Sequence, residues 1–168
     1  MMMEIRFAND GDPAGWMTLV QSVRDAFPGL ETPEALAAHR DTVMEFIARR
    51  EAICAVEKGR VVGALLFSRK ENELCFLAVL PEFRRQHIAE RMVALTLPEL
   101  DPERDVTVTT YREGVPEGIA ARAFYQRLGF REGALTEEFG SPVQQFVLKH
   151  RFVPAGTTVS PQKPELPS

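Results

Sequence analysis

Residues 77–92 of this chain read LAVLPEFRRQHIAERM. The apolar first part is typical of a buried strand, and it leads through a short basic loop directly into a segment with helical spacing. Backbone N–H groups at the start of a helix have no intrahelical partner, and the helix macrodipole adds about half a positive charge there. With Arg84 and Arg85 beside it, this turn is suited to bind a diphosphate. A solvated basic helix start has the same charge pattern, so the loop alone leaves both interpretations open.

The segment resembles the central motif of the GNAT family, the acetyl-CoA-dependent N-acetyltransferases, whose pattern is Gln/Arg-x-x-Gly-x-Gly/Ala. Arg84 and Ala89 match the first and last places, whereas His87 stands where the family has glycine. A histidine with a negative φ still offers its N–H to the pyrophosphate, so we expect weaker binding rather than none. The resemblance implies a cofactor site that includes Leu77, Ala78, Val79, Arg84, Arg85, Gln86, His87, Ile88, Ala89 and Glu90.

A second motif follows later in the chain, after one predicted strand. Residues 121–130 read ARAFYQRLGF, which is similar to the family pattern Ala-x-x-x-Tyr-x-x-x-Gly-Phe. The resemblance implies that Tyr125 lies near the thioester sulfur and acts as general acid, and that Phe124 borders the same channel. A phenol with a pKa of about 10 stays protonated at neutral pH and can serve a leaving thiolate. The competing interpretation is a tyrosine packed in the core. Gly118 replaces an asparagine common in the family, so that cofactor contact is expected to be missing.

A general base would take the proton of an amine, which arrives protonated because its pKa is about 10. In histone-acetylating members of the family the base is a glutamate on the motif strand, and Glu73 stands at the corresponding place. A glutamate at a strand end is also commonly only solvated. The family's polarising group is a main-chain N–H near Ala78 and Val79, where a bulge is expected to splay the strand from its parallel neighbour.

Hydrophobic periodicity and breaker residues predict one domain over residues 1–150, followed by a disordered, proline-rich tail at 151–168. The fold class is predicted as α/β (α+β), a GNAT-like fold with one mixed, mostly antiparallel sheet of about six to seven strands and about four helices. Asp12 is predicted to cap the first helix, and Ile119, Ala123 and Leu128 to form the apolar side of the last. The predicted strands are Glu4–Phe7, Ala52–Glu57, Arg60–Ser68, Glu73–Val79, Val106–Thr109, Arg131–Phe139 and Val143–Leu148, and helices begin at Pro13, Pro33, Ile88 and Pro116.

The composition argues against several classes of function. A net charge of −4 over 168 residues disfavours nucleic acid or an anionic membrane as the main partner. Cys54 and Cys75 lie in apolar runs and are predicted to be reduced core thiols of a cytoplasmic protein. The three histidines and two cysteines lack metal-ligand spacing, and His39 is predicted to lie at the edge of the core. No apolar stretch approaches the roughly 20 residues that cross a bilayer.

These features predict an enzyme, an acyl-CoA-dependent N-acetyltransferase in which an amine attacks the thioester of acetyl-CoA directly, without a metal. The acceptor is a small-molecule amine or a peptide amine, and a homodimer is compatible with the family. The family builds its acceptor side from the first two helices and the late strands, here residues 13–50 and 137–145. Glu31, Glu137 and Glu138 are compatible with a cationic acceptor. The alternative is a binding module that senses acyl-CoA without turnover.

Overall fold

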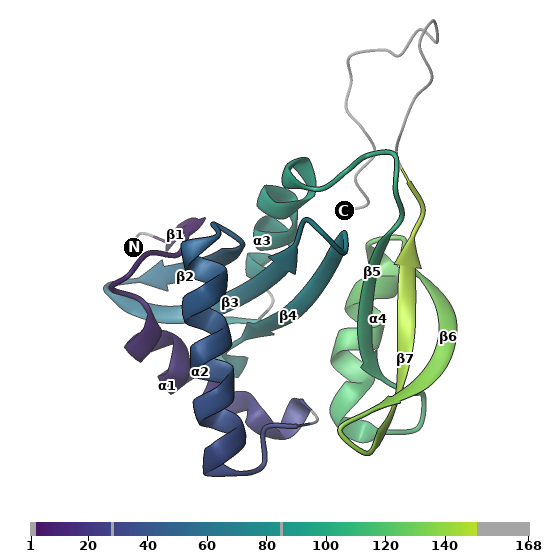
Figure 1. Cartoon of the computed structure of the whole chain (residues 1–168), viewed down its shortest axis with the longest axis horizontal. Coiled ribbons are helices and arrows are strands. Elements are labelled where there is room, and N and C mark those ends of the chain that lie inside the picture. The colour runs from purple at the N-terminus through teal and green to yellow at the C-terminus, as the bar shows by residue number, and fades with distance from the viewer. Residues whose placement is uncertain (1–2, 28, 85, 151–168) are drawn as a thin grey trace, which may run out of the picture.

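The structure of the protein is a computed structural model that describes residues 3–27, 29–84 and 86–150 (Figure 1). Within these residues the chain forms a seven-stranded sheet in the order β1-β2-β3-β4-β5-β7-β6. Every pair is antiparallel except β4–β5, which confirms the predicted mixed sheet. The strands are β1 Met3–Phe7, β2 Ala52–Glu57, β3 Arg60–Ser68, β4 Glu73–Val79, β5 Val106–Tyr111, β6 Arg131–Glu138 and β7 Ser141–Leu148.

Helices cover both sides of the sheet. In Figure 1, α2 lies in front of β2 and β3, and α3 lies behind them. Trp16 of α1 and Met92 of α3 are fully buried, so each helix contributes to the core. The helices are α1 Pro13–Val23, α2 Pro33–Ala48, α3 Ile88–Thr96 and α4 Ile119–Arg127, with short 3₁₀ helices η1 Arg24–Ala26, η2 Pro81–Phe83, η3 Leu97–Glu99 and η4 Pro116–Gly118.

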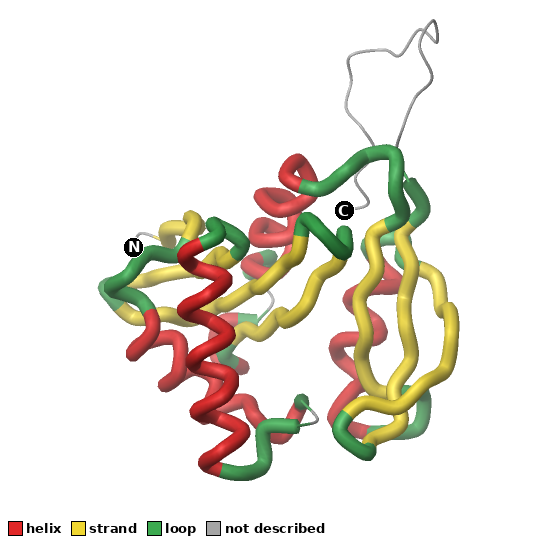
Figure 2. The backbone as a smooth tube through the Cα atoms, in the orientation of Figure 1, coloured by secondary structure: helices red, strands yellow, loops and turns green. Residues whose placement is uncertain are grey.

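The sheet divides between β4 and β5. These two strands pair only at Glu73–Thr107 and Leu74–Val108, and their later residues diverge (Figure 2). The β3–β4 register shifts opposite Leu66 and Phe67, which leaves Cys75 as the extra residue on β4. The bulge expected near Ala78 and Val79 is therefore wrong in position, because these residues keep regular pairing with β3. The divergence begins at Cys75, and the later part of β4 has one edge without a partner strand.

Two local predictions are corrected by salt bridges. Asp12 is the N-cap residue of α1 as predicted, but its carboxylate makes no capping hydrogen bond, because it accepts from Arg6 at 2.8 and 3.1 Å and from the Asn9 amide at 2.7 Å. On the last helix, Leu128 is buried as predicted, whereas Ile119 is 65% exposed and Ala123 is exposed, so these two do not belong to an apolar side. Arg122 is buried instead, and its guanidinium donates to the Tyr111 carbonyl at 3.0 Å and pairs with Glu132. A buried arginine is tolerated here because its donors are satisfied.

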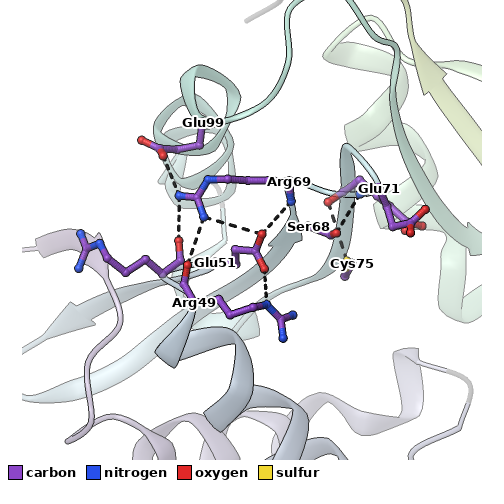
Figure 3. A network of polar contacts seen from close by, with 9 residues as sticks. Arg49, Glu51, Ser68, Arg69, Glu71, Cys75 and Glu99 are labelled. Carbon is purple, nitrogen blue, oxygen red and sulfur yellow. Dashed lines mark hydrogen bonds and ion pairs between the residues drawn. The ribbon is translucent and has the colours of Figure 1, made fainter.

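A polar network at the end of α2 connects that helix to β3 and η3 (Figure 3). The Glu51 carboxylate accepts hydrogen bonds from the Arg49 guanidinium and the Arg69 amide, both at 2.8 Å. Arg69 also pairs with Glu99 at 2.8 Å. Burial alone would raise the pKa of Glu51, but these hydrogen bonds outweigh it and hold the pKa below its ordinary value. The network therefore stabilises the ionised form of a carboxylate that is only 8% exposed.

Several other predictions concern single residues or absences. Cys54 is buried as predicted, but Cys75 is exposed, so it is not a core thiol. Among the described residues there is no cluster of metal-ligating side chains. None of the helices in the same part of the chain has the length and apolar character needed to cross a membrane. Residues 151–168, predicted as a tail, lie outside the described residues.

Candidate active site

A cavity of about 1300 Å³ lies where β4 and β5 diverge. Its walls come from β4, β5, the start of α3, α4, the α1–α2 segment and the turn between β6 and β7. A pocket for one small molecule usually measures about 300–1,000 Å³, so this cavity has room for more than one. Many of the residues singled out in the sequence lie along it: Leu77, Ala78, Val79, Arg84, His87, Ile88, Ala89, Glu90, Phe124 and Tyr125.

The start of α3 forms one end of the cavity. Ile88 is buried and anchors this turn in the core, while Arg84 is exposed. The His87 side chain makes no capping hydrogen bond to the first turn, so it does not occupy the N–H groups that follow. Gln86 is exposed and does not line the cavity, and Arg85 lies outside the described residues. The turn thus combines helix N–H groups with one guanidinium, as an anion site requires.

His87 has a left-handed backbone, with φ of +59° and ψ of +24°. From the sequence we expected a negative φ at His87, which would leave its N–H free for the pyrophosphate, and this prediction is wrong. A glycine adopts this conformation without steric cost, whereas a residue with a Cβ does not. The His87 Nδ1 lies 2.5 Å from the Glu90 carboxylate, so the two side chains form a contact across the first turn of α3. The histidine keeps the conformation typical of the motif's glycine and places a side chain at the mouth.

Tyr125 faces the cavity from α4. Its side chain is 5% exposed, and its ring packs against Phe124, Phe130 and Phe146 at centroid distances of 5.4, 5.6 and 6.1 Å. Burial raises the pKa of the phenol, so the protonated form predominates over an even wider pH range than in water. The tyrosine is both packed among aromatic rings and a lining residue of the cavity, so the two interpretations from the sequence are compatible.

Gly118 shows why the family's asparagine has no place here. A Cβ added at this position would lie 2.6 Å from the Cβ of Tyr111. Such a distance is too short for any side chain unless the backbone moves. Tyr111 therefore fills the space in which the asparagine side chain would start.

Glu73 lies at the closed end of the division, where β4 still pairs with β5. Burial first, and then the carboxylates of Glu138 and Glu71, raise the pKa of Glu73. A raised pKa suits a group that accepts a proton near neutral pH. However, Glu73 does not line the cavity, whereas Glu138 does. A proton would have to reach Glu73 through an intermediate such as water.

The acceptor side was predicted only as the ranges 13–50 and 137–145, and the aromatic residues that line it were not singled out. Phe27, His39 and Phe139 fall within these ranges and line the same cavity. The Nε2 atom of His39 is buried without a hydrogen-bond partner, and burial lowers the pKa of this imidazole to about 4. His39 is therefore a neutral aromatic group at neutral pH. No local pattern in the sequence predicts that these residues line one cavity, because only the tertiary fold brings them together.

Comparison with known families and proteins gives two results. Residues 48–132 match the family model of the acetyltransferase (GNAT) domain. This range contains both motifs and the strand between them. A comparison with curated protein sequences finds no significant match.

The fold resembles many solved structures, each of which has low sequence identity to this chain. A GNAT-family acetyltransferase from Bacillus cereus has 16% identity and a TM-score of 0.69, with 89% of this chain and 99% of that one covered. A GNAT-family acetyltransferase described as putative, from Desulfovibrio desulfuricans, has 19% identity and a TM-score of 0.68, over 88% and 99%. The PaiA N-acetyltransferase of Thermoplasma acidophilum, in complex with coenzyme A, has 16% identity and a TM-score of 0.65, over 89% and 100%.

Proposed function

Because the chain belongs to the GNAT acetyltransferase family, we propose that it transfers an acetyl group from acetyl-CoA to a primary amine. The observation that carries this proposal is one cavity lined by both the start of α3 and Tyr125. The first can bind a diphosphate, and the second can supply a proton. They lie on opposite sides of the division between β4 and β5, so a ligand bound there meets both.

The residues of the cavity fit coenzyme A. The N–H groups at the start of α3 and the Arg84 guanidinium are suited to its diphosphate. Leu77, Ala78 and Val79 belong to the part of β4 that has no partner on the β5 side, so main-chain groups there are available to a thioester carbonyl and an amide-containing arm. Phe124 adds an apolar surface. Acetyl-CoA would supply the activated acyl group as its thioester, and the solved PaiA structure is a complex with coenzyme A.

Acyl transfer to an amine requires three things from the protein. A main-chain N–H near Ala78 and Val79 polarises the carbonyl, and the Tyr125 hydroxyl donates its proton to the departing thiolate. The attacking nitrogen must lose a proton before or during the attack. We assign that proton to Glu73, through water, because its raised pKa supports the role and its position outside the cavity wall excludes direct contact.

The role of Tyr125 is tested by Tyr125→Phe, with Tyr111→Phe as the matched control. Loss of a general acid lowers kcat by about 10²–10⁴-fold. We expect such a fall for Tyr125→Phe, with the coenzyme A Kd unchanged by calorimetry, and no comparable effect for Tyr111→Phe, because Tyr111 does not line the cavity. Turnover that survives in Tyr125→Phe would remove this residue from the mechanism.

The role of Glu73 is tested by the pH dependence of kcat/KM. If Glu73 accepts the amine proton, Glu73→Gln should abolish the acidic limb of that profile and lower its plateau. A profile that keeps its shape would exclude Glu73 as the base. Glu103→Gln is the control, because Glu103 is an exposed carboxylate that does not line the cavity and is not among the groups that raise the pKa of Glu73.

A sensor of acyl-CoA without turnover is the second candidate function. It is favoured by His87, a residue with a side chain and a left-handed backbone at the position where the family motif has glycine. Thiol release from acetyl-CoA with a panel of amines separates the two functions. Thermal stabilisation by acetyl-CoA with no thiol release would favour the sensor. No calorimetric heat with coenzyme A at millimolar concentration would contradict both.

Self-association through β6 is a further part of the proposal. This strand lies at the edge of the sheet, and all of its residues, Arg131–Glu138, are exposed. An exposed edge strand can pair with a second copy. Light scattering that gives the mass of one chain, 18.8 kDa, at every concentration would contradict a homodimer.

A further inference from the structure

We propose that the acceptor is a monoamine whose body is aromatic or bulky and apolar. It would be seated between an aromatic wall, formed by Phe27, His39 and Phe76, and the Phe139 ring on the β6–β7 turn. This inference rests on the proposed acetyltransfer and names its substrate class. It differs from the cationic acceptor suggested by the acidic residues of the sequence, because it assigns most of the contact to apolar surface.

The aromatic wall consists of three rings that pack against one another at tilted angles. The ring of Phe76 lies 4.5 Å from that of Phe27 and 4.8 Å from the imidazole of His39. The three residues belong to β4, the α1–α2 segment and α2, and all of them line the cavity. Since His39 is neutral, this wall carries no charge. Its rings offer faces and edges on which an aryl group can pack.

The same segment offers no partner for a second positive charge. Its described lining residues between Val23 and Phe46 include no Asp, Glu, Lys or Arg. A diamine or polyamine inserted along this wall would bury an ammonium group without a counterion, which is strongly unfavourable. Glu117 and Glu138 line the cavity from the other side and are suited to attract a single ammonium group. This distribution of charge fits an amine with one charged end and one apolar body.

Phe139 lines the same cavity from the turn between β6 and β7 and has an unfavourable backbone conformation. It is 78% exposed and has a φ of +52°, and Gly140 after it has a φ of +77°. Residues with two consecutive positive φ angles in a hairpin turn are usually Asn, Asp or Gly. A bulky ring that stays mostly exposed at this place costs conformational energy and gains little burial within the chain, as is typical of residues kept for function.

The ring of Phe139 lies close to Gly29. A Cβ added at Gly29 would lie 2.7 Å from the Phe139 ring, so the ring can keep this position only while residue 29 has no side chain. Gly29 has a φ of +89°, which also favours glycine. Two turns far apart in the sequence thus meet at the rim of the cavity. A ligand seated on the wall of Phe27 and Phe76 would be covered by this ring.

The test compares kcat/KM for 2-phenylethylamine, ethylamine and butane-1,4-diamine with acetyl-CoA. We expect 2-phenylethylamine to exceed the other two by at least about tenfold, the range typical of added apolar contact in a pocket. Phe139→Ala should raise KM for 2-phenylethylamine about tenfold and leave KM for ethylamine and acetyl-CoA unchanged. Leu135→Ala is the matched control, because Leu135 is 61% exposed on β6 and does not line the cavity. Phe139→Tyr should restore the preference.

Binding is measured independently of turnover by saturation-transfer NMR of 2-phenylethylamine with the protein and coenzyme A. Transfer that Phe139→Ala reduces and Leu135→Ala preserves supports the acceptor class even if the chain proves to be a sensor. Equal kcat/KM for all three amines, a preference for the diamine, or absence of transfer would overturn the inference. Acetylation of ethylamine or the diamine alone would retain the proposed function and reject only this acceptor class.

Discussion

The left-handed backbone at His87 makes a prediction that can be worked out from its geometry. Replacing a Cβ-bearing residue by glycine at positive φ relieves about 1–2 kcal/mol. The larger conformational entropy of glycine in the unfolded chain removes about 0.5–1 kcal/mol of that gain. His87→Gly should therefore be about 0.5–1 kcal/mol more stable to unfolding than His87→Ala, which keeps the steric conflict. The exposed contact with Glu90 is lost in both variants, so its small contribution, about 0.2–1 kcal/mol, cancels in the comparison.

Thermal and urea unfolding of the two variants provide the measurement. For a chain of this size, 1 kcal/mol corresponds to about 2–4 °C in Tm, so the glycine variant should melt about 1–4 °C above the alanine variant. If His87→Ala is as stable as His87→Gly, residue 87 does not have a positive φ, and the argument that it replaces the motif's glycine is refuted.

Three further substitutions test the fold by urea unfolding between pH 3 and 8. Glu51→Gln should lose about 1–2 kcal/mol at pH 7, and the loss should shrink as the pH falls below about 4.5, because a lowered pKa stabilises the fold only above the unfolded-state value; exposed Glu82→Gln should change little, and a constant difference would contradict the shift. Glu73→Gln should be more stable than the parent at pH 7 and equal to it below about 4.5, since a raised pKa has the opposite sign. Asn72→Ala should lose about 3–4 kcal/mol and Asn72→Gly about 1 kcal/mol less, because Asn72 is buried, bonded and at positive φ; equal losses would contradict the backbone part.

The strands of the sheet could be predicted from sequence because their information is local. The bounds predicted for β2, β3 and β4 agree with the structure. Continuous apolar runs predict β2 and β3, alternation predicts β4, and the turn between the first two, Lys58-Gly59, has the two positive φ angles of a tight hairpin. The family motifs supplied the fold class, since each lies on the helix that the pattern requires.

The positions that could not be predicted depend on contacts between distant segments. Arg122 is buried because carbonyl and carboxylate partners from β5 and β6 reach it, and no spacing along α4 indicates this. Asp12 leaves its capping role because Arg6 competes for the carboxylate. The proposed acceptor site depends on distant contacts as well. Phe27, Phe76 and Phe139 line one cavity only after the two halves of the sheet have assembled.

The two halves must also be held in register, and the two β4–β5 ladder pairs are few for that task. Asn72, next to the first pair, adds a further connection, beside the hydrogen bond that the Arg104 guanidinium donates to the Lys70 carbonyl at 3.0 Å. Its side-chain amide donates to the carbonyls of Asp101, Arg104 and Asp105 at 3.1–3.3 Å and accepts from the Asp101 amide at 2.8 Å. These residues form the link from η3 to β5, so one fully buried side chain fixes the closed end of the division. The open end can then hold a ligand between α3 and Tyr125 without loosening the sheet, because the fixed end sets the distance between them.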